Sequence, residues 1–262
     1  MQEKQLYSKA GKILANKLTA PGHYLMKISL PEIASTLIPG QFIMLDTGCS
    51  VYLNRPFSIL ETNSTEGTFE IIYKIFGKGT RSLSEKKEGD EIRVTGPLGN
   101  DFGIEKLPNN SKILMVAGGV GMPPLHWGTL AAKKLGHKVD WLMGAATKET
   151  LLMPEKVKQV ADSLGISTDD GSEGYKGRVG ELLKEYLKEN KPDIIITCGP
   201  NPMMKAVSEV AAQNNIKALV SLEEIMGCGF GICVGCVYED KEAGYKKSCT
   251  DGPVVAADRV KW

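Results

Sequence analysis

The sequence predicts an α+β protein of three domains, and three observations support this division. Short apolar segments separated by turn residues fill the N-terminal part of the chain, which is typical of an antiparallel β-barrel. From about Ser111 onward, apolar strands alternate with helices, as in a doubly wound α/β domain. Four of the six cysteines lie between residues 228 and 249, which indicates a small cysteine-rich domain. We therefore expect domains at 1–104, 105–222 and 223–262.

In the first domain, each expected strand is a short apolar run bounded by turn residues such as Pro21-Gly22 and Pro39-Gly40. Five strands are expected, at Tyr24–Leu30, Gln41–Leu45, Pro56–Leu60, Thr68–Ile75 and Glu91–Thr95. Many short strands at this spacing favour a barrel over an open sheet.

In the second domain, buried strands and amphipathic helices follow one another along the chain, which predicts a parallel sheet covered on both faces. The expected elements are strands at Lys112–Ala117, Lys138–Met143, Asp193–Thr197 and Ala218–Leu222 and helices at Pro123–Leu135 and Pro202–Gln213. The short segment around Pro108 predicts that the two large domains pack closely. Beyond residue 222 we expect few core residues, with a metal cluster in their place.

Composition excludes several classes of protein. The net charge of +1 gives no strong attraction to nucleic acid or to an anionic membrane. The polar start of the chain and the lack of a long apolar run predict neither a signal peptide nor a membrane helix, so we expect a cytoplasmic protein. The three histidines show no ligand spacing, and no Ser/His/Asp arrangement is present, so we expect no catalytic acid–base residues in this chain.

The cysteines near the C-terminal end have the spacing Cys-x4-Cys-x2-Cys-x12-Cys, which is typical of a plant-type [2Fe–2S] cluster. The predicted ligands are Cys228, Cys233, Cys236 and Cys249. Glycines surround them, and we expect these glycines to adopt positive φ so that backbone N–H groups can point at the sulfurs. The glycines concerned are Gly227, Gly229, Gly231 and Gly235. A zinc site and a pair of disulfides are the alternatives, but zinc sites usually show two Cys-x2-Cys pairs.

Two segments of the first domain could hold a flavin. The first is the tetrapeptide Arg55, Pro56, Phe57 and Ser58, whose arginine could neutralise a diphosphate and whose serine could bind the ring system. The second runs from Ile72, Tyr73 and Lys74 to Gly79 and Thr80, where small residues at a helix start could bind an anion. Each segment also has an ordinary explanation, as a strand with a structural arginine and as a turn with a helix cap.

Two segments of the second domain are suited to a dinucleotide. Gly118, Gly119 and Gly121 follow a strand and open a helix, so they could let a diphosphate approach the backbone. Cys198, Gly199 and Pro200 stand at the carboxyl end of another strand, where ligands of open α/β sheets bind, so Cys198 could line a nicotinamide pocket. The alternatives are a plain βα turn and a small buried thiol.

These motifs occur together in one order, and the chain resembles the ferredoxin–NADP⁺ reductase superfamily over nearly its whole length. More narrowly, it is similar to the electron-transfer subunits of type B dihydroorotate dehydrogenase. The narrower resemblance rests on three segments, which are 221–236, 249–255 with the run to Trp262, and 168–177.

The resemblance implies that FAD is held by the two flavin segments and a [2Fe–2S] cluster by the four cysteines. It also implies a partner, an FMN-containing catalytic subunit that oxidises dihydroorotate in pyrimidine (UMP) biosynthesis, with two copies of each subunit in a heterotetramer. Electrons would pass from FMN to the cluster, then to FAD and then to NAD⁺. The sequence departs from many relatives at Ala146, where they carry arginine, and Cys49 has no assigned role.

For the nicotinamide cofactor we expect NAD, because Asp169 and Asp170 would repel the 2′-phosphate of NADP and could accept a ribose hydroxyl. Two alternative functions stay open. The chain could be the flavin and iron–sulfur subunit of another NAD(P)-linked complex, such as an NADPH:ferredoxin oxidoreductase or a sulfhydrogenase. It could also be a zinc-binding interaction module.

Overall fold

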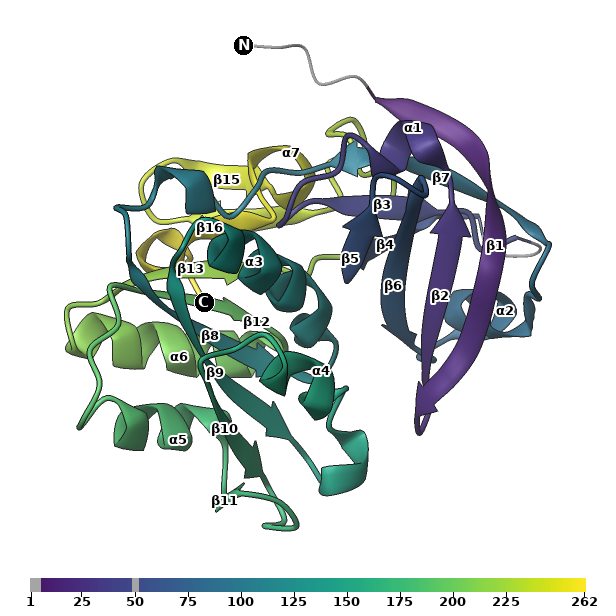
Figure 1. Cartoon of the computed structure of the whole chain (residues 1–262). Helices are drawn as coiled ribbons and strands as arrows, with labels where there is room; N and C mark the ends of the chain where they lie inside the picture. The colour runs from purple at the N-terminus through teal and green to yellow at the C-terminus, as the bar shows by residue number, and fades with distance from the viewer. Residues whose placement is uncertain (1–5, 49–51) are drawn as a thin grey trace.

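The computed structural model describes residues 6–48 and 52–262, and Cys49 lies outside these ranges. Two seven-stranded sheets lie side by side, and the C-terminal segment lies at their junction (Figure 1). The first sheet is antiparallel throughout, with the strand order β4-β3-β7-β1-β2-β6-β5. Its strands are β1 (Tyr7–Ala20), β2 (His23–Ser29), β3 (Phe42–Leu45), β4 (Arg55–Ser58), β5 (Glu61–Asn63), β6 (Thr68–Lys74) and β7 (Glu91–Leu98). Strand β4 also contacts β6, so the sheet curls into a half-barrel.

The five strands predicted for this domain are confirmed, with shifted ends, but β1 was missed. This strand pairs with β7 along its first half and with β2 along its second half. Few of its side chains are buried, so it lacks the alternation of apolar residues by which strands are recognised. At Gly11 a side chain would meet Ile28 Cγ2 at 2.8 Å, so the two strands cross there without room for a Cβ.

The half-barrel is closed by an apolar core and two short helices. Ile13, Met26, Ile43 and Phe69 are almost completely buried inside it. The covering helices are α1 (Pro31–Ala34) and α2 (Lys78–Glu85), and the latter places Leu83 in the core.

The second sheet is parallel except for its last strand, and its order is β11-β10-β9-β8-β12-β13-β16. The strands are β8 (Lys112–Gly118), β9 (Lys138–Ala145), β10 (Ser163–Thr168), β11 (Tyr175–Lys176), β12 (Ile194–Cys198), β13 (Lys217–Ser221) and β16 (Val254–Ala256). The helices are α3 (Met122–Lys134), α4 (Pro154–Lys158), α5 (Val179–Tyr186) and α6 (Asn201–Gln213). Short 3₁₀ helices lie between these elements, at Ile104–Lys106, Gly119–Gly121 and Lys148–Thr150, and after β16 at Ala257–Arg259.

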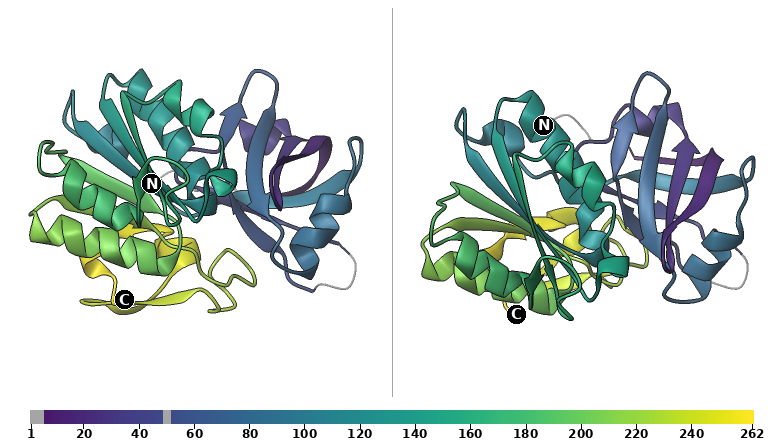
Figure 2. Two further views of the ribbon diagram at one scale, coloured as in Figure 1. Left: turned by 90° about the horizontal axis from the view of Figure 1, so that it is seen from below. Right: turned by 60° about the horizontal axis from the view of Figure 1, so that its bottom comes forward.

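Alternate residues of the central strands face opposite layers, which confirms the doubly wound prediction. On one face Met115 and Trp141 pack with α3, and on the other face Leu114 and Ile195 pack with α5 and α6 (Figure 2). The four predicted strands and two predicted helices are present, whereas β10, β11 and α5 were missed. The sequence of β10 is Ser-Leu-Gly-Ile-Ser-Thr, which is too short and too polar to predict a strand.

The two sheets share one apolar core, which confirms the expected close packing of the large domains. Leu60 and Ile72 of the first sheet belong to the same buried cluster as Met122 and Leu125 of α3. A Cβ on Gly128 of that helix would lie 3.2 Å from the Phe102 ring, so α3 packs closely against Phe102.

The expectation that the C-terminal segment has few core residues is wrong. It forms the hairpin β14 (Val237–Asp240) and β15 (Gly244–Lys247), the short helix α7 (Ser248–Asp251) and β16. Strand β16 pairs antiparallel with β13, and Tyr238 and Val255 are buried against Val220 and Leu222. The segment therefore extends the second sheet and shares its core.

The described residues contain no helix with the length and hydropathy that a bilayer crossing requires.

Asn100 ties the first sheet to the C-terminal segment, which allows a test of this arrangement. Its Nδ2 donates to the Val254 carbonyl at 2.7 Å, and its Oδ1 accepts from the Val254 N–H at 2.9 Å. We expect Asn100→Ala to leave buried backbone groups unsatisfied, at a cost of about 1–3 kcal/mol. Amide exchange in β16 should then be about 10- to 100-fold faster by hydrogen–deuterium mass spectrometry.

The matched control is Asn190→Ala, because Asn190 donates only to the nearby Tyr186 carbonyl at 3.0 Å. It should leave exchange in β16 unchanged. Equal protection of β16 in Asn100→Ala and wild type would show that Asn100 does not hold this strand.

Candidate functional site

The first two cysteines of the motif form a pair held by backbone N–H groups. Cys228 N–H donates to Cys233 Sγ and Cys233 N–H donates to Cys228 Sγ, each at 3.4 Å. Phe230 and Gly235 add N–H donors at 3.4 and 3.5 Å. Burial raises the pKa of the Cys228 thiol, but the N–H donors of Cys233 and Phe230 outweigh it and lower that pKa to about 6. The loop is therefore built to stabilise a thiolate.

The glycines of this loop act in two ways, and the sequence predicted only one of them. Gly229 and Gly231 have φ of +84° and +91°, as expected. Gly227 and Gly235 do not adopt positive φ; instead, a Cβ on them would lie 3.2 and 3.6 Å from Cys233 Sγ. The sulfur therefore leaves little room for a side chain at Gly227, whereas its contact with Gly235 is an ordinary one. The remaining positive φ in this stretch belongs to Val234, at +58°, which a β-branched residue rarely adopts.

The other two cysteines form a buried pair. Cys236 and Cys249 are 1% and 2% exposed and pack with Phe42, Met44 and Leu98 at the end of the first sheet. Burial, followed by the neighbouring Cys236 thiol, raises the pKa of Cys249 to about 12. A thiolate is thus costly here unless a metal binds it.

The four cysteines form two pairs of free thiols. All five cysteines within the described residues are free. Across residues 6–48 and 52–262, no three His, Cys, Asp or Glu side chains converge on one point that could hold a single metal ion. Two pairs of thiolates suit a cluster in which each iron takes two of the four cysteines.

The first flavin segment lies on β4, whose residues alternate between the interior and the surface. Phe57 points into the half-barrel core, where its ring meets Tyr73 edge-on at 5.8 Å. Tyr73 donates its hydroxyl to Asn16 Oδ1 at 2.9 Å, so both aromatic side chains have structural roles. Arg55 and Ser58 are half-buried.

The second flavin segment brings three groups together at the start of α2. A Cβ on Gly79 would lie 3.1 Å from Thr47 Oγ1 and 3.4 Å from Arg55 Nε. Thr47 Oγ1 is buried and has no hydrogen-bond partner among the described residues. The Thr80 hydroxyl accepts from the N–H groups of Phe76 and Gly77 at 2.9 and 3.2 Å. An orphaned hydroxyl, a guanidinium and a helix start fit a diphosphate.

The glycine-rich turn and the Cys198 segment meet at the carboxyl edge of the second sheet, as predicted. A Cβ on Gly121 would collide with the Cys198 carbonyl oxygen, and one on Gly118 would lie 2.5 Å from Met203 Sδ. These two glycines are therefore required for packing between the two loops. Gly119, at φ +52°, has no described heavy atom within 4 Å of its Cβ position, so it faces open space.

At the same edge, Cys198 is buried, and burial raises the pKa of its thiol above the usual range. The nearby Glu223 carboxylate raises it further. Desolvation also raises the pKa of Glu223 itself. Sequence reasoning missed Glu223 and Thr47 as site residues, because only the folded chain brings them to these positions.

Asp169 and Asp170 follow β10 at this edge, but Asp170 is already engaged. Its Oδ1 accepts from the Ser172 N–H and Oγ at 3.0 and 2.6 Å. The hydrogen bond from the Ser172 hydroxyl is the main cause of a lowered Asp170 pKa. The Asp170 N–H donates to the Ala146 carbonyl at 3.3 Å, so the backbone of Ala146 helps to hold this turn in place.

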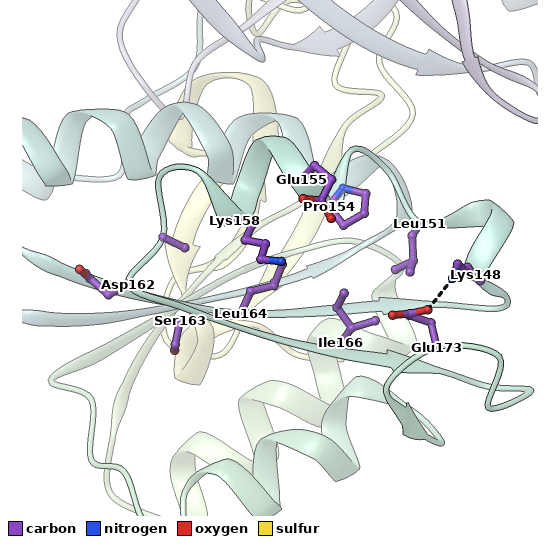
Figure 3. Close-up of a pocket in the computed structure, with 11 residues that line it drawn as sticks. Lys148, Leu151, Pro154, Glu155, Lys158, Asp162, Ser163, Leu164, Ile166 and Glu173 are labelled. Atoms are coloured by element: carbon purple, nitrogen blue, oxygen red, sulfur yellow. Dashed lines mark ion pairs between the residues drawn. The ribbon is translucent and has the colours of Figure 1, made fainter.

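A cavity of about 540 Å³ lies beside this turn, between α4 and β10 (Figure 3). The ion pair Lys148–Glu173, at 2.9 Å, stands at one end and Asp162 at the other. Its lining mixes charges of both signs with apolar residues and includes none of the predicted site residues.

Comparison with known proteins covers each part of the chain. A family model described as the iron–sulfur cluster binding domain of dihydroorotate dehydrogenase B matches residues 223–261. Models of the oxidoreductase NAD-binding and FAD-binding domains match residues 115–209 and 12–102.

Similar curated proteins carry one description. The dihydroorotate dehydrogenase B (NAD⁺) electron transfer subunit of Desulforamulus reducens is 36% identical over 96% of this chain and 97% of its own length. That of Caldanaerobacter subterraneus is 41% identical over 85% and 86%. A probable subunit of Methanocaldococcus jannaschii is 42% identical over 86% and 81%.

Solved structures agree in fold. A chain of the NADH-dependent reduced ferredoxin–NADP oxidoreductase superposes with a TM-score of 0.88 at 33% identity, covering 96% of this chain and 90% of that one. A ferredoxin–NADP⁺ reductase from Neisseria gonorrhoeae, at 19% identity and a TM-score of 0.66, covers 79% of this chain and 91% of that one and shows the fold alone. From these matches over its whole length, the chain belongs to the family of electron transfer subunits of dihydroorotate dehydrogenase B (NAD⁺).

Proposed function

We propose that this chain carries electrons between an FMN-containing dihydroorotate dehydrogenase subunit and NAD⁺, through a [2Fe–2S] cluster and FAD. The proposed division of labour assigns residues 1–104 to FAD, 105–222 to NAD and 223–262 to the cluster. Two copies of each subunit would form a heterotetramer in the cytoplasm, where thiols stay reduced until iron binds them. A nicotinamide exchanges a hydride and a cluster single electrons, whereas a flavin exchanges either, so FAD belongs between them.

The observation that carries this proposal is the pairing of the four cysteines against the first sheet. Cys228 and Cys233 would hold one iron and Cys236 and Cys249 the other. The buried pair packs on Phe42 and Leu98, so the cluster would lie beside the domain that holds the flavin.

Arg55, Gly79 and Thr80, with Thr47 beside them, would hold the diphosphate of FAD. Ser58 and the exposed Lys74 would hold its ring end, beside the buried Ile72, whereas Pro56, Phe57 and Tyr73 shape the strands beneath. For NAD, Gly119 would face the diphosphate and Cys198 the nicotinamide, on loops that Gly118, Gly121, Gly199 and Pro200 let pack together.

The partner surface is proposed from exposed apolar residues around Cys228 and Cys233, which we call the outer pair, whereas Cys236 and Cys249 are the inner pair. Ile225, Ile232 and Val234 are 83%, 76% and 58% exposed. Ile232 and Val234 flank Cys233 in the sequence, and Ile225 precedes Cys228. Such side chains on one loop favour a protein partner over solvent. An FMN-bearing subunit docked there would meet the cluster through its outer pair.

Reconstitution tests the function. We expect the chain, purified with an FMN-bearing catalytic subunit, to support dihydroorotate-dependent reduction of NAD⁺, and Cys236→Ser to abolish it because one cluster ligand is lost. NADH should still bleach the bound flavin in that variant, followed at its visible absorbance. The control is Cys198→Ala, which should keep its iron.

Undiminished transfer in Cys236→Ser would contradict the route. A complex without dihydroorotate turnover would favour another NAD(P)-linked reductase, such as the ferredoxin–NADP type.

The FAD site is tested by Arg55→Gln. Removing the guanidinium from the diphosphate position should weaken FAD binding by about 10- to 100-fold, as expected for a charged hydrogen bond of about 1.5–3 kcal/mol. Flavin fluorescence during titration of the deflavinated protein measures this. Arg93→Gln is the control, because Arg93 is exposed on β7 and should leave the affinity unchanged. Equal FAD affinity in Arg55→Gln and wild type would remove Arg55 from the site.

For the nicotinamide cofactor, we expect kcat/KM to be higher with NADH than with NADPH, because Asp169 and Asp170 repel a 2′-phosphate. Steady-state flavin reduction with both cofactors measures the ratio. Asp170→Asn should reduce the preference, whereas Asp258→Asn, on the exposed 3₁₀ turn near the chain end, should not. A preference of about tenfold for NADPH, equal to about 1.4 kcal/mol, would overturn the assignment.

A further inference from the structure

Lys247 connects the two halves of the cysteine site, although its position in the sequence carries no motif. Its Nζ donates to the carbonyl of Gly231 at 3.0 Å, although the two residues are 16 positions apart in the sequence. Gly231 stands between Cys228 and Cys233, whereas Lys247 stands two residues before Cys249. The Lys247 ammonium therefore links the loop between Cys228 and Cys233 to the segment that carries Cys249.

The peptide that accepts this hydrogen bond belongs to the loop around Cys228 Sγ. The Gly231 carbonyl and the Ile232 N–H form one peptide unit, which lies in the chain between the Phe230 and Cys233 N–H groups. Both of those N–H groups donate to Cys228 Sγ at 3.4 Å. A cation on the carbonyl polarises the peptide and strengthens its N–H as a donor, because hydrogen bonds in a chain reinforce one another.

Gly231 itself is packed tightly against the segment that carries Cys249. Gly231 has φ of +91°, and a Cβ there would lie 2.8 Å from Thr250 Cγ2 and 3.5 Å from Lys247 Nζ. Only glycine fits this crowded position, which places Lys247 and Thr250 directly on the loop.

We propose that Lys247 sets the reduction potential of the cluster, by placing a positive charge on the Gly231–Ile232 peptide, within the loop whose N–H groups donate to the Cys228 sulfur. The proposal rests on the proposed function, since it takes the four cysteines to hold a [2Fe–2S] cluster. Reduction adds one electron to the cluster and breaks no bond, so the reduced state carries one more negative charge. A fixed cation and the N–H donors that it polarises stabilise that state and raise the potential.

One carboxylate stands close to this cation. Asp251 Oδ2 accepts from the Lys247 backbone N–H at 2.9 Å and from the Thr250 hydroxyl at 3.4 Å. These two bonds hold Asp251 to the backbone of the segment, whereas the Lys247 ammonium reaches away to Gly231. The charge nearest to the loop carbonyl is therefore positive.

The experiment compares Lys247→Gln, Lys247→Arg and Lys246→Gln with wild type in the intact complex. Glutamine keeps an N–H donor and loses the charge, whereas arginine keeps both. Lys246 is the neighbouring lysine, and within the described residues its side chain makes no hydrogen bond to the loop. Iron and acid-labile sulfide are measured first, and the cluster is then titrated with redox dyes and followed by electron paramagnetic resonance.

At a fixed ambient potential, we expect the ratio of reduced to oxidised cluster in Lys247→Gln to fall about tenfold, which equals about 59 mV for one electron. Lys247→Arg and Lys246→Gln should stay near wild type. An unchanged ratio in Lys247→Gln would overturn the proposal. So would loss of iron from Lys247→Gln, because Lys247 would then be an anchor of the loop. Wild-type protein without a [2Fe–2S] signal would instead refute the proposed function.

Discussion

Burial of Cys236 and Cys249 against the end of the first sheet is the constraint on which the rest of the site depends. Phe42, Met44 and Leu98 surround these thiols, and the low polarity there works against a thiolate. Iron binding reverses that preference, since a metal takes the thiolate and releases the proton. The same apolar contacts that fix the C-terminal segment on the flavin domain therefore make its inner thiols dependent on a metal.

The two cysteine pairs differ in a way that gives the site a direction. The outer pair carries N–H donors and lies among exposed apolar side chains, whereas the inner pair has apolar neighbours from β3 and β7. One end of the site thus faces a surface and the other faces the half-barrel. An electron carrier between a partner subunit and a flavin needs this arrangement, because both neighbours must be close to it.

The sequence allowed the local parts of the site to be predicted, and it failed where contacts are long-range. The positive φ of Gly229 and Gly231 is a local property, and the structure confirms it. The close approach of Cys233 Sγ to Gly227, and the hydrogen bond from Lys247 to Gly231, depend on how separate segments pack. No periodicity or motif marks these contacts.

The same distinction explains the fold. Strands with buried, alternating residues were predicted, whereas β1 was missed because few of its side chains are buried, and β16 because its partner strand β13 lies far away in the sequence. Strand β16 illustrates the physical reason. Only three residues long, it is stable as a strand because β13 supplies its backbone partners and Asn100 binds Val254.

The glycine-rich turn shows why a motif alone does not assign a role to each of its residues. Gly118 and Gly121 lack room for a Cβ because the Cys198 loop and Met203 press against them, so their smallness is explained without any ligand. Gly119 has free space at its Cβ position and a left-handed backbone, so no packing contact explains why this residue is small. Tight packing of the two loops is nevertheless part of the site. It brings the glycine turn and Cys198 to one edge of the sheet, and α3, which starts at this turn, packs against the flavin domain through Trp127. A nucleotide bound at that edge would therefore lie at the start of α3, the helix that packs against the flavin domain.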